Sequence, residues 1–130
     1  MKKPRRGQRF RVLDGRYAVC RLGPRESVPT WVGGAFVNIT RTPDELSVIC
    51  PGECVPAEVR AERDWRVLRL VGPFPFTAIG VQASIATPLA KAKISLLSIA
   101  TYDTDYFMIK GDVLEQAVAA LTAAGHQRVD

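Results

Sequence analysis

The chain has 130 residues, 47% of them hydrophobic and 24% charged, a composition that excludes a disordered protein and fits one domain or two small modules. Its net charge of +5 is concentrated at one end, because positions 1–11 hold six basic and no acidic residues and leave 12 basic and 13 acidic residues elsewhere. We therefore expect a nearly neutral globule with a basic arm, which is either mobile or a fraying first strand.

The first half of the chain contains four short segments in which apolar and polar residues alternate as in β-strands. They are residues 16–22, 36–42, 45–50 and 66–71. Pro43 and Asp44 are typical turn residues, so the second and third segments predict a β-hairpin over residues 36–50. One helical turn over residues 28–32 and a weak helix over residues 57–62 complete the elements that we expect in this half.

The second half has clearer patterns, which predict two helices around a second β-hairpin. We expect a helix over residues 77–92 with Thr77 as its N-cap, followed by hairpin strands over residues 94–102 and 105–110. The second helix is expected to begin at a capping box formed by Asp112 and Glu115 and to end at Gly125. The five residues that follow Gly125 leave room for a short final strand.

The order of the elements from strand 66–71 onward is βαββαβ, which is typical of the ferredoxin-like fold, an antiparallel sheet with helices on one face. The first half repeats this order in a degraded form. The fold class that we predict is α+β, with two tandem ferredoxin-like modules over residues 12–65 and 66–130 after the arm of residues 1–11. A module of about 60 residues is marginally stable by itself, so we expect the two to pack together or share a sheet.

Residues with catalytic or metal-binding chemistry are few. His126 is the only histidine, and its position near a helix end predicts a surface or helix-dipole role. Cys50 and Cys54 have no further ligands nearby in sequence to complete a zinc site. No paired nucleophile and base and no phosphate-binding or metal-binding motif appears. We predict a protein that is not an enzyme and that holds no metal or cofactor.

The cellular setting follows from the cysteines and the apolar segments. Cys20 and Cys50 lie in apolar stretches, which predicts buried, reduced thiols. No apolar run reaches the ~20 residues of a membrane span, and no apolar segment follows the basic arm as it would in a signal peptide. These observations favour a reducing, cytoplasmic location and no membrane partner.

The densest group of polar side chains lies in the second hairpin, between Ser98 and Tyr106. It is either an ordinary polar turn or one wall of a pocket at the N-terminus of helix 77–92, where free N–H groups suit a carboxylate. Gly80 would let a ligand approach the backbone, and Asp105 would pair with an ammonium group. A carboxylate site beside an ammonium site fits a free α-amino acid.

Two stretches of the second half, GPFPFTAIGV and PLAKAKISLLSIATYDTDYFMIKGDVLEQAVAALTAAGH, resemble the ACT-domain amino-acid sensors. The most similar subgroup is the one named for the eukaryotic arginine sensors (CASTOR), with its small bacterial relatives. DGRYAVCRL, FVNITRTPDELSVICP and ERDWRVLRLVG in the first half are similar to the same bacterial relatives. The resemblance implies tandem ACT modules, the first degraded, that bind an amino acid without catalysis.

In such sensors the amino acid binds between paired ACT modules. The resemblance implies a site made of Gly80, Val81, Tyr102 and Asp105 from one module, with Ser95 and Leu96 from a partner module. The second module occurs once per chain, so the partner is expected to be a second copy in a homodimer. Ala83 stands where the arginine sensors have an acidic residue, which leaves the identity of the amino acid open.

Two other functions remain open from the sequence. In one, the fold is only a dimerisation or protein-docking platform, which the mostly apolar strand 94–99 and the degraded first half favour. In the other, the basic arm binds nucleic acid weakly and without sequence preference. Neither LRLVG, in strand 66–71, nor TDYFMIK, in the second hairpin, has the aromatic and basic pattern of an RNA-recognition module, so nucleic acid is the weaker expectation.

Overall fold

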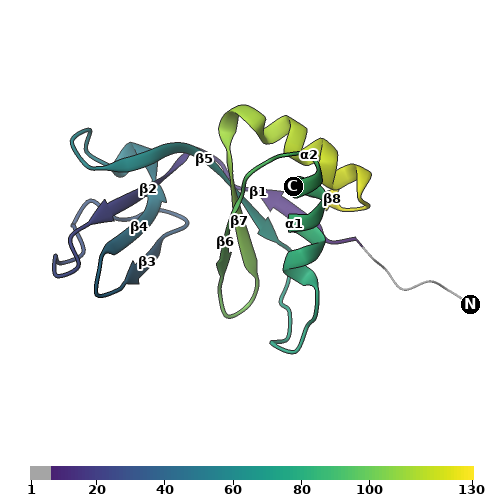
Figure 1. Cartoon of the computed structure of the whole chain (residues 1–130), viewed down its shortest axis with the longest axis horizontal. Helices are drawn as coiled ribbons and strands as arrows, with labels where there is room; N and C mark the ends of the chain where they lie inside the picture. The colour runs from purple at the N-terminus through teal and green to yellow at the C-terminus, as the bar shows by residue number, and fades with distance from the viewer. Residues whose placement is uncertain (1–6) are drawn as a thin grey trace, which may run out of the picture. The chain divides into compact units, whose positions relative to one another are not determined.

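The computed structural model describes residues 7–130 (Figure 1), so most of the predicted basic arm lies outside the described residues. The chain forms two compact units. Residues 15–65 make up the first, which we call the β unit, and the described residues 7–14 together with 66–130 make up the second, which we call the helical unit. Strand β5 (Ala61–Leu70) contributes its beginning to the β unit and its end to the helical unit.

The β unit is an antiparallel sheet in the order β3-β4-β2-β5. Its strands are β2 (Tyr17–Leu22), β3 (Asn38–Arg41), β4 (Leu46–Pro51) and the start of β5. The pairing of β3 with β4 confirms the predicted hairpin over residues 36–50. The core of the unit consists of small and branched apolar side chains and buried thiols: Ala18, Cys20, Leu46, Val48, Cys50 and Val55.

The weak helix predicted over residues 57–62 is wrong. Val59 donates to the carbonyl of Pro56 in a turn, and β5 begins at Ala61, where it pairs with Cys20 of β2. Ladder hydrogen bonds along β2 therefore outweigh the helix propensity of this segment. A single 3-10 turn, Gly52–Cys54, precedes it, and the helical turn expected over residues 28–32 is reduced to one bond, 3.2 Å long, from Val32 N–H to the Pro29 carbonyl.

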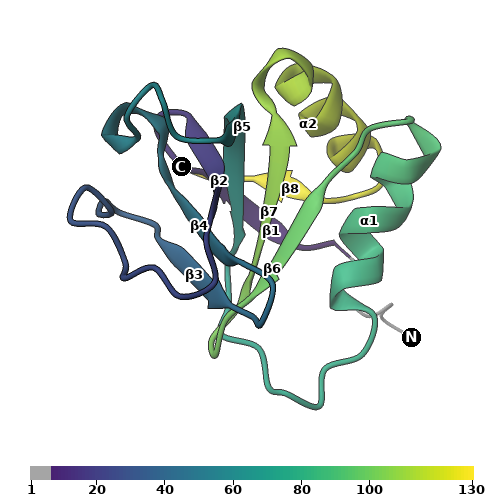
Figure 2. The ribbon, with the colours of Figure 1, turned by 60° about the vertical axis from the view of Figure 1, so that its left-hand side comes forward.

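The helical unit is a sheet in the order β6-β7-β5-β1-β8 with two helices on one face. Its elements are β1 (Arg9–Val12), α1 (Val81–Lys91), β6 (Leu97–Ala100), β7 (Asp105–Lys110), a 3-10 turn (Gly111–Val113), α2 (Leu114–Ala123) and β8 (Gln127–Arg128). Figure 2 shows α1 and α2 side by side against the strands. This arrangement confirms the predicted α+β class.

One core joins the sheet to the helices. Its members alternate along each strand and recur every three or four residues along each helix: Phe10, Leu68, Leu70, Ile85, Leu89, Ile94, Phe107, Ile109, Leu114, Ala117 and Leu121. Ile85 and Leu89 are the buried residues of α1, and they lie one helical turn apart on the face that packs against the sheet. Pro88 lies inside α1, and the helix continues to Lys91.

Residues 9–11 of the predicted arm are part of strand β1 rather than a mobile tail. Phe10 is completely buried, and β1 pairs antiparallel with β5 and parallel with β8. Burial of an aromatic side chain and hydrogen bonds on both edges outweigh the tendency of a basic segment to remain solvated. The strand β1 takes the place beside β5 that the βαββαβ order gives to the final strand, and β8 pairs with β1 instead.

Both predicted N-caps are wrong. Helix α1 begins after Gly80, whose φ of 78° lies in the left-handed region, so the helix does not extend back to Thr77. Asp112 lies in the 3-10 turn before α2, and Val113 at the N-cap of α2 makes no side-chain capping bond, so the capping box is not formed. Gly125, with φ of 97°, follows the last turn of α2 as predicted.

The predicted surface role of His126 is also wrong. Its side chain is 5% exposed and joins three segments of the helical unit. The N–H of Gln8 donates to Nδ1 at 2.9 Å, and Nε2 lies 2.8 Å from the carbonyl of Ser84 in α1. This pattern assigns the neutral tautomer with its proton on Nε2. The turn after α2 directs the ring inward, so it secures both β1 and α1.

Candidate functional site

A pocket of about 560 Å³ lies within the helical unit, between the loop that precedes α1, the first turn of α1 and the turn that joins β6 to β7. Its volume falls within the ~300–1,000 Å³ of small-molecule sites. Gly80, Val81, Tyr102 and Asp105, which the sequence singled out, all line this pocket. The fold therefore brings these four residues together, while their role in binding a ligand stays a prediction.

The first turn of α1 supplies hydrogen-bond donors to one wall. Gly80 at the N-cap has no side chain to offer, and the first turn contains no acidic residue. Within residues 7–130, the N–H groups of Val81, Gln82 and Ala83 therefore have no intrahelical acceptor and no side-chain cap. The same end of the helix carries the positive pole of its dipole. This wall suits an anionic group, and the absent Cβ of Gly80 leaves open space beside it, since an added Cβ would meet nothing within 4 Å.

Asp105 supplies the opposite charge. It begins β7, is half-buried, and accepts a long hydrogen bond of 3.4 Å on Oδ1 from Nε2 of Gln82. Gln82 also lines the pocket but was not among the predicted site residues. The carboxylate and the helix N-terminus thus present opposite charges to one cavity, which is the arrangement that a zwitterion requires.

Two threonines, which the sequence analysis did not select, hold the β6–β7 turn in place. The hydroxyl of Thr101 donates to the carbonyl of Thr104 at 2.7 Å, and the hydroxyl of Thr104 donates to the carbonyl of Leu70 in β5 at 2.9 Å. Phe74, in the loop before α1, donates its N–H to the carbonyl of Asp103 at 2.8 Å. The turn is therefore tied to both β5 and the loop, and the Thr-x-x-Thr spacing is the one sequence signal for it.

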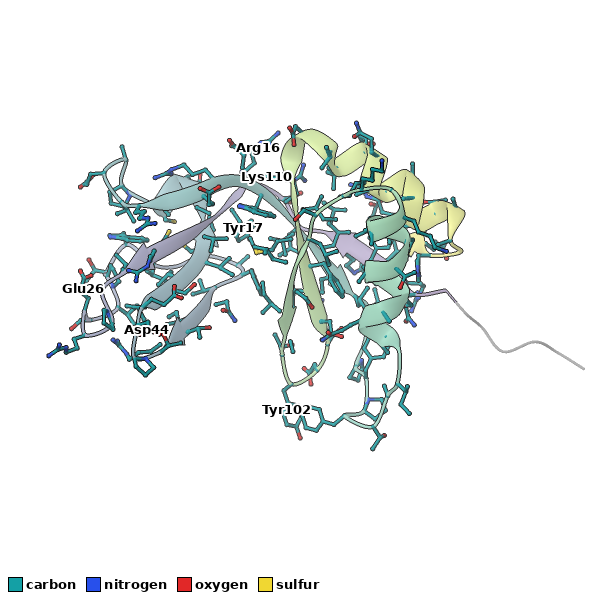
Figure 3. All side chains as sticks on the ribbon, viewed as in Figure 1. Arg16, Tyr17, Glu26, Asp44, Tyr102 and Lys110 are labelled. Carbon is teal, nitrogen blue, oxygen red and sulfur yellow. The ribbon has the colours of Figure 1, made fainter. Side chains whose placement is uncertain are left out.

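Aromatic side chains form the rim. The rings of Phe76 and Tyr102 meet edge to face with their centroids 4.9 Å apart. They are 76% and 79% exposed, and the adjacent Ile79 is 96% exposed. Figure 3 shows Tyr102 at the end of the β6–β7 hairpin. The rim thus offers an exposed apolar surface, suited to contact with a ligand or another protein.

The remaining predicted site residues, Ser95 and Leu96, do not line this pocket. They precede β6, and Leu96 is half-buried against the core of the helical unit. Their predicted contribution requires a second chain and stays a prediction. Within residues 7–130, no cluster of His, Cys, Asp and Glu side chains is arranged to hold a metal ion, and no helix is both long and apolar enough to cross a membrane.

Comparison with known proteins identifies the family. A family model described as "ACT domain" matches residues 60–123, and a second model, described as an N-terminal domain, matches residues 15–58. The crystal structure of a protein from Agobacterium tumefaciens (Atu0741) is 34% identical, with a TM-score of 0.90 over 95% of this chain and 93% of that chain. The chain is an ACT-domain protein. ACT domains are regulatory modules that typically bind small molecules such as amino acids.

Other solved structures are similar to this ACT-domain protein in fold. A Vibrio cholerae protein (VC0802), described as a possible transport protein, has 22% identity and a TM-score of 0.75, covering 91% of this chain and 90% of that one. The regulatory subunit of aspartate kinase from Thermus thermophilus has 11% identity and a TM-score of 0.59, covering 85% and 93%. No functionally curated protein matches the sequence significantly.

Proposed function

We propose that this ACT-domain protein is a non-catalytic sensor that binds a free α-amino acid in the pocket at the N-terminus of α1. The observation that carries the proposal is the pairing of unsatisfied N–H groups at Val81–Ala83 with the carboxylate of Asp105 across one cavity. The narrower resemblance to the CASTOR-like sensors, stated above from the sequence, supports the same ligand class.

The binding mode follows from the charges. The α-carboxylate of the ligand accepts hydrogen bonds from the first turn of α1, where the backbone donors and the dipole favour an anion. Its ammonium group donates to Asp105, a charge-assisted bond stronger than the long contact that Gln82 makes there. The ligand side chain then lies towards the rim of Phe76 and Tyr102.

The pocket offers little for catalysis. Among the described residues, its lining has no histidine, cysteine or lysine, and His126 is buried elsewhere with both ring nitrogens engaged. Asp103 and Asp105 are the titratable groups of the lining apart from the Tyr102 phenol, and no nucleophile stands beside either as an activated pair. Binding rather than turnover is what these side chains support.

We also propose that the sensor acts as a homodimer. Among the described strands, β6 pairs only with β7, which leaves its other edge open to a second chain. Ser95 and Leu96 lead into that edge, where they would approach the pocket of a partner copy. The ligand would then be enclosed between two protomers.

The test is a thermal-shift screen of the twenty amino acids at millimolar concentration. A ligand at a hundredfold excess over Kd stabilises the folded protein by about 2.7 kcal/mol, which raises Tm by several degrees. Asp105→Asn keeps the shape of the side chain but loses its charge and is expected to abolish the shift. Asp112→Asn, at an exposed aspartate outside the pocket, is the matched control and keeps it.

The proposal fails if no amino acid raises Tm, or if Asp105→Asn responds as the wild type does. In that case the docking-platform alternative gains support, because the exposed side chains of Phe76, Ile79 and Tyr102 form an apolar surface without a ligand. Light scattering at micromolar concentration then separates the cases, since a monomer contradicts both a dimerisation platform and a site completed by a second copy.

A further inference from the structure

The two units differ in the sign of their net charge. The described residues of the helical unit, 7–14 and 66–130, hold 8 Lys and Arg residues against 6 Asp and Glu residues, a net charge of +2, whereas the β unit holds 6 against 7, a net charge of −1. Residues 1–6, outside the described part of the chain, add four basic residues and no acidic one. An asymmetry of this kind indicates a polyanionic partner for the basic unit.

Strand register places three of these cations on one face. Arg11 in β1 lies directly opposite Arg69 in β5, and residues opposite each other in an antiparallel pair share a face. Arg9 precedes Arg11 by two residues and therefore points to the same side. The intervening Phe10 belongs to the core beneath the helices, so the three arginines lie on the face of the sheet away from α1 and α2. All three are exposed.

These charges are not neutralised by the described part of the chain. Arg21, Arg41, Arg63 and Arg66 all donate to backbone carbonyls. By contrast, the guanidinium groups of Arg9, Arg11 and Arg69 make no hydrogen bond or ion pair with any residue between 7 and 130. Like charges directly opposite each other destabilise a sheet, so the arrangement costs stability unless an anion is bound.

We propose that Arg9, Arg11 and Arg69 form a surface that binds the phosphate backbone of a nucleic acid without reading its sequence. The planar guanidinium group matches a phosphate with two parallel hydrogen bonds, and all three cations are arginines. None of the large, exposed apolar residues lies on β1, β5 or β8 within the described chain, so this face has nothing to insert into a bilayer. The face shares no residue with the amino-acid pocket.

The experiment measures the binding of a fluorescent 20-base-pair DNA duplex and a 20-nucleotide RNA by anisotropy at several salt concentrations. Each phosphate contact contributes about −0.7 to −0.9 to the slope of log K against log salt. The full chain with Arg9→Gln, Arg11→Gln and Arg69→Gln is expected to have a slope less negative by about 2.1 to 2.7. Between 50 and 200 mM salt the wild type then loses roughly 20- to 40-fold more affinity than the variant.

The matched control changes three exposed arginines of the β unit, Arg16, Arg25 and Arg60, to Gln and removes the same net charge. This control is expected to keep the wild-type slope of log K against log salt. The triple variant Arg9→Lys, Arg11→Lys, Arg69→Lys is expected to keep that slope as well, and it also shows that the strands tolerate substitution. Equal loss in the control would overturn the proposal, because the effect would then follow net charge alone.

A chain without residues 1–6 isolates the arginine face from the basic residues that precede it. The same triple substitution must still reduce the slope in this shorter chain; if it does not, binding belongs to residues 1–6 and the proposal is wrong. Retention on vesicles of anionic phospholipid without binding to either nucleic acid would also contradict it and indicate a membrane surface instead.

Discussion

Thr104→Val removes one buried hydrogen bond from the turn beside the pocket and changes little else. The hydroxyl of Thr104 is the donor to the carbonyl of Leu70, at 2.9 Å, and its side chain is 5% exposed. Valine has almost the same volume and is also β-branched, so the χ1 preference is kept. The bonds from Thr101 to the carbonyl of Thr104 use the backbone and survive the substitution.

The expected cost combines two contributions. The carbonyl of Leu70, itself in a buried residue, loses its hydroxyl donor, which costs about 1–3 kcal/mol. The new methyl group recovers roughly 0.8 kcal/mol by its burial. We therefore expect Thr104→Val to lower the free energy of unfolding by about 1–2 kcal/mol.

Urea denaturation followed by two probes measures this loss and shows in which of the two units it occurs. Both α-helices belong to the helical unit, and both tryptophans, Trp31 and Trp65, belong to the β unit. Circular dichroism at the helix band therefore follows the unit that contains Thr104, and tryptophan fluorescence follows the other. The midpoint from circular dichroism is expected to fall by about 0.5–1 M, since m is ~1–3 kcal/mol per M of urea.

Thr87→Val, at an exposed position of α1, is the matched control and is expected to stay within about 0.5 kcal/mol of the wild type. If Thr104→Val also stays within that range, the hydroxyl of Thr104 does not tie the hairpin to β5. An equal loss in both variants would contradict the prediction too, because the effect would then follow from replacing any threonine by valine.

Further predictions concern two buried groups. His126→Ala leaves the N–H of Gln8 and the carbonyl of Ser84 without partners and opens a cavity. We therefore expect the free energy of unfolding, measured with urea, to fall by about 2–4 kcal/mol. A fall below ~1 kcal/mol would contradict the bridging role of His126. Burial, with a smaller contribution from neighbouring thiols, raises the pKa of Cys50 from 9.0 to about 11. Cys50 in the folded chain then keeps a proton that the unfolded chain releases, so its contribution to the free energy of unfolding is constant below about pH 9 and falls towards pH 11, by at most ~2–3 kcal/mol. Denaturation at pH 8 and pH 10.5 measures this fall in the free energy of unfolding, which Cys50→Ala should reduce. In a separate test, iodoacetamide should modify the half-buried Cys54 before the buried Cys50.

Elements that depend on local patterns were predictable. The hairpin of β3 and β4 follows from alternation on both sides of Pro43 and Asp44, and β7 has the predicted bounds because its apolar run begins directly after a turn. The start of α1 was not predictable from Thr77, a good capping residue, because the left-handed Gly80 interrupts the backbone between them. Residue propensities alone do not show whether a helix begins at a capping residue such as Thr77 or after a left-handed glycine such as Gly80.

Elements that depend on distant partners were not predictable. Strand β1 is stable because Phe10 pairs opposite Leu70 and Arg128, and neither neighbour can be inferred from a basic N-terminal segment. The residues of the candidate site also divide into those that the order of elements predicts and those that depend on side-chain geometry. The βαββαβ order was enough to bring Gly80 to the β6–β7 hairpin, but the bond from Thr104 depends on side-chain geometry that the order of elements does not contain.

The place of β1 also affects how the chain is made. Phe10 leaves the ribosome 60 residues before Leu70, its partner in β5, which at ~5–20 residues per second is a delay of several seconds. The β unit is continuous in sequence and has all its strands once Trp65 is synthesised, while β1 waits unpaired for β5 and then for β8. Nascent chains therefore pass through a state in which the β unit is complete while β1, with the apolar side chain of Phe10, is still unpaired. A fragment cut at residues 60 and 123 lacks both β1 and β8, so it would leave Leu70 without the strand that covers it.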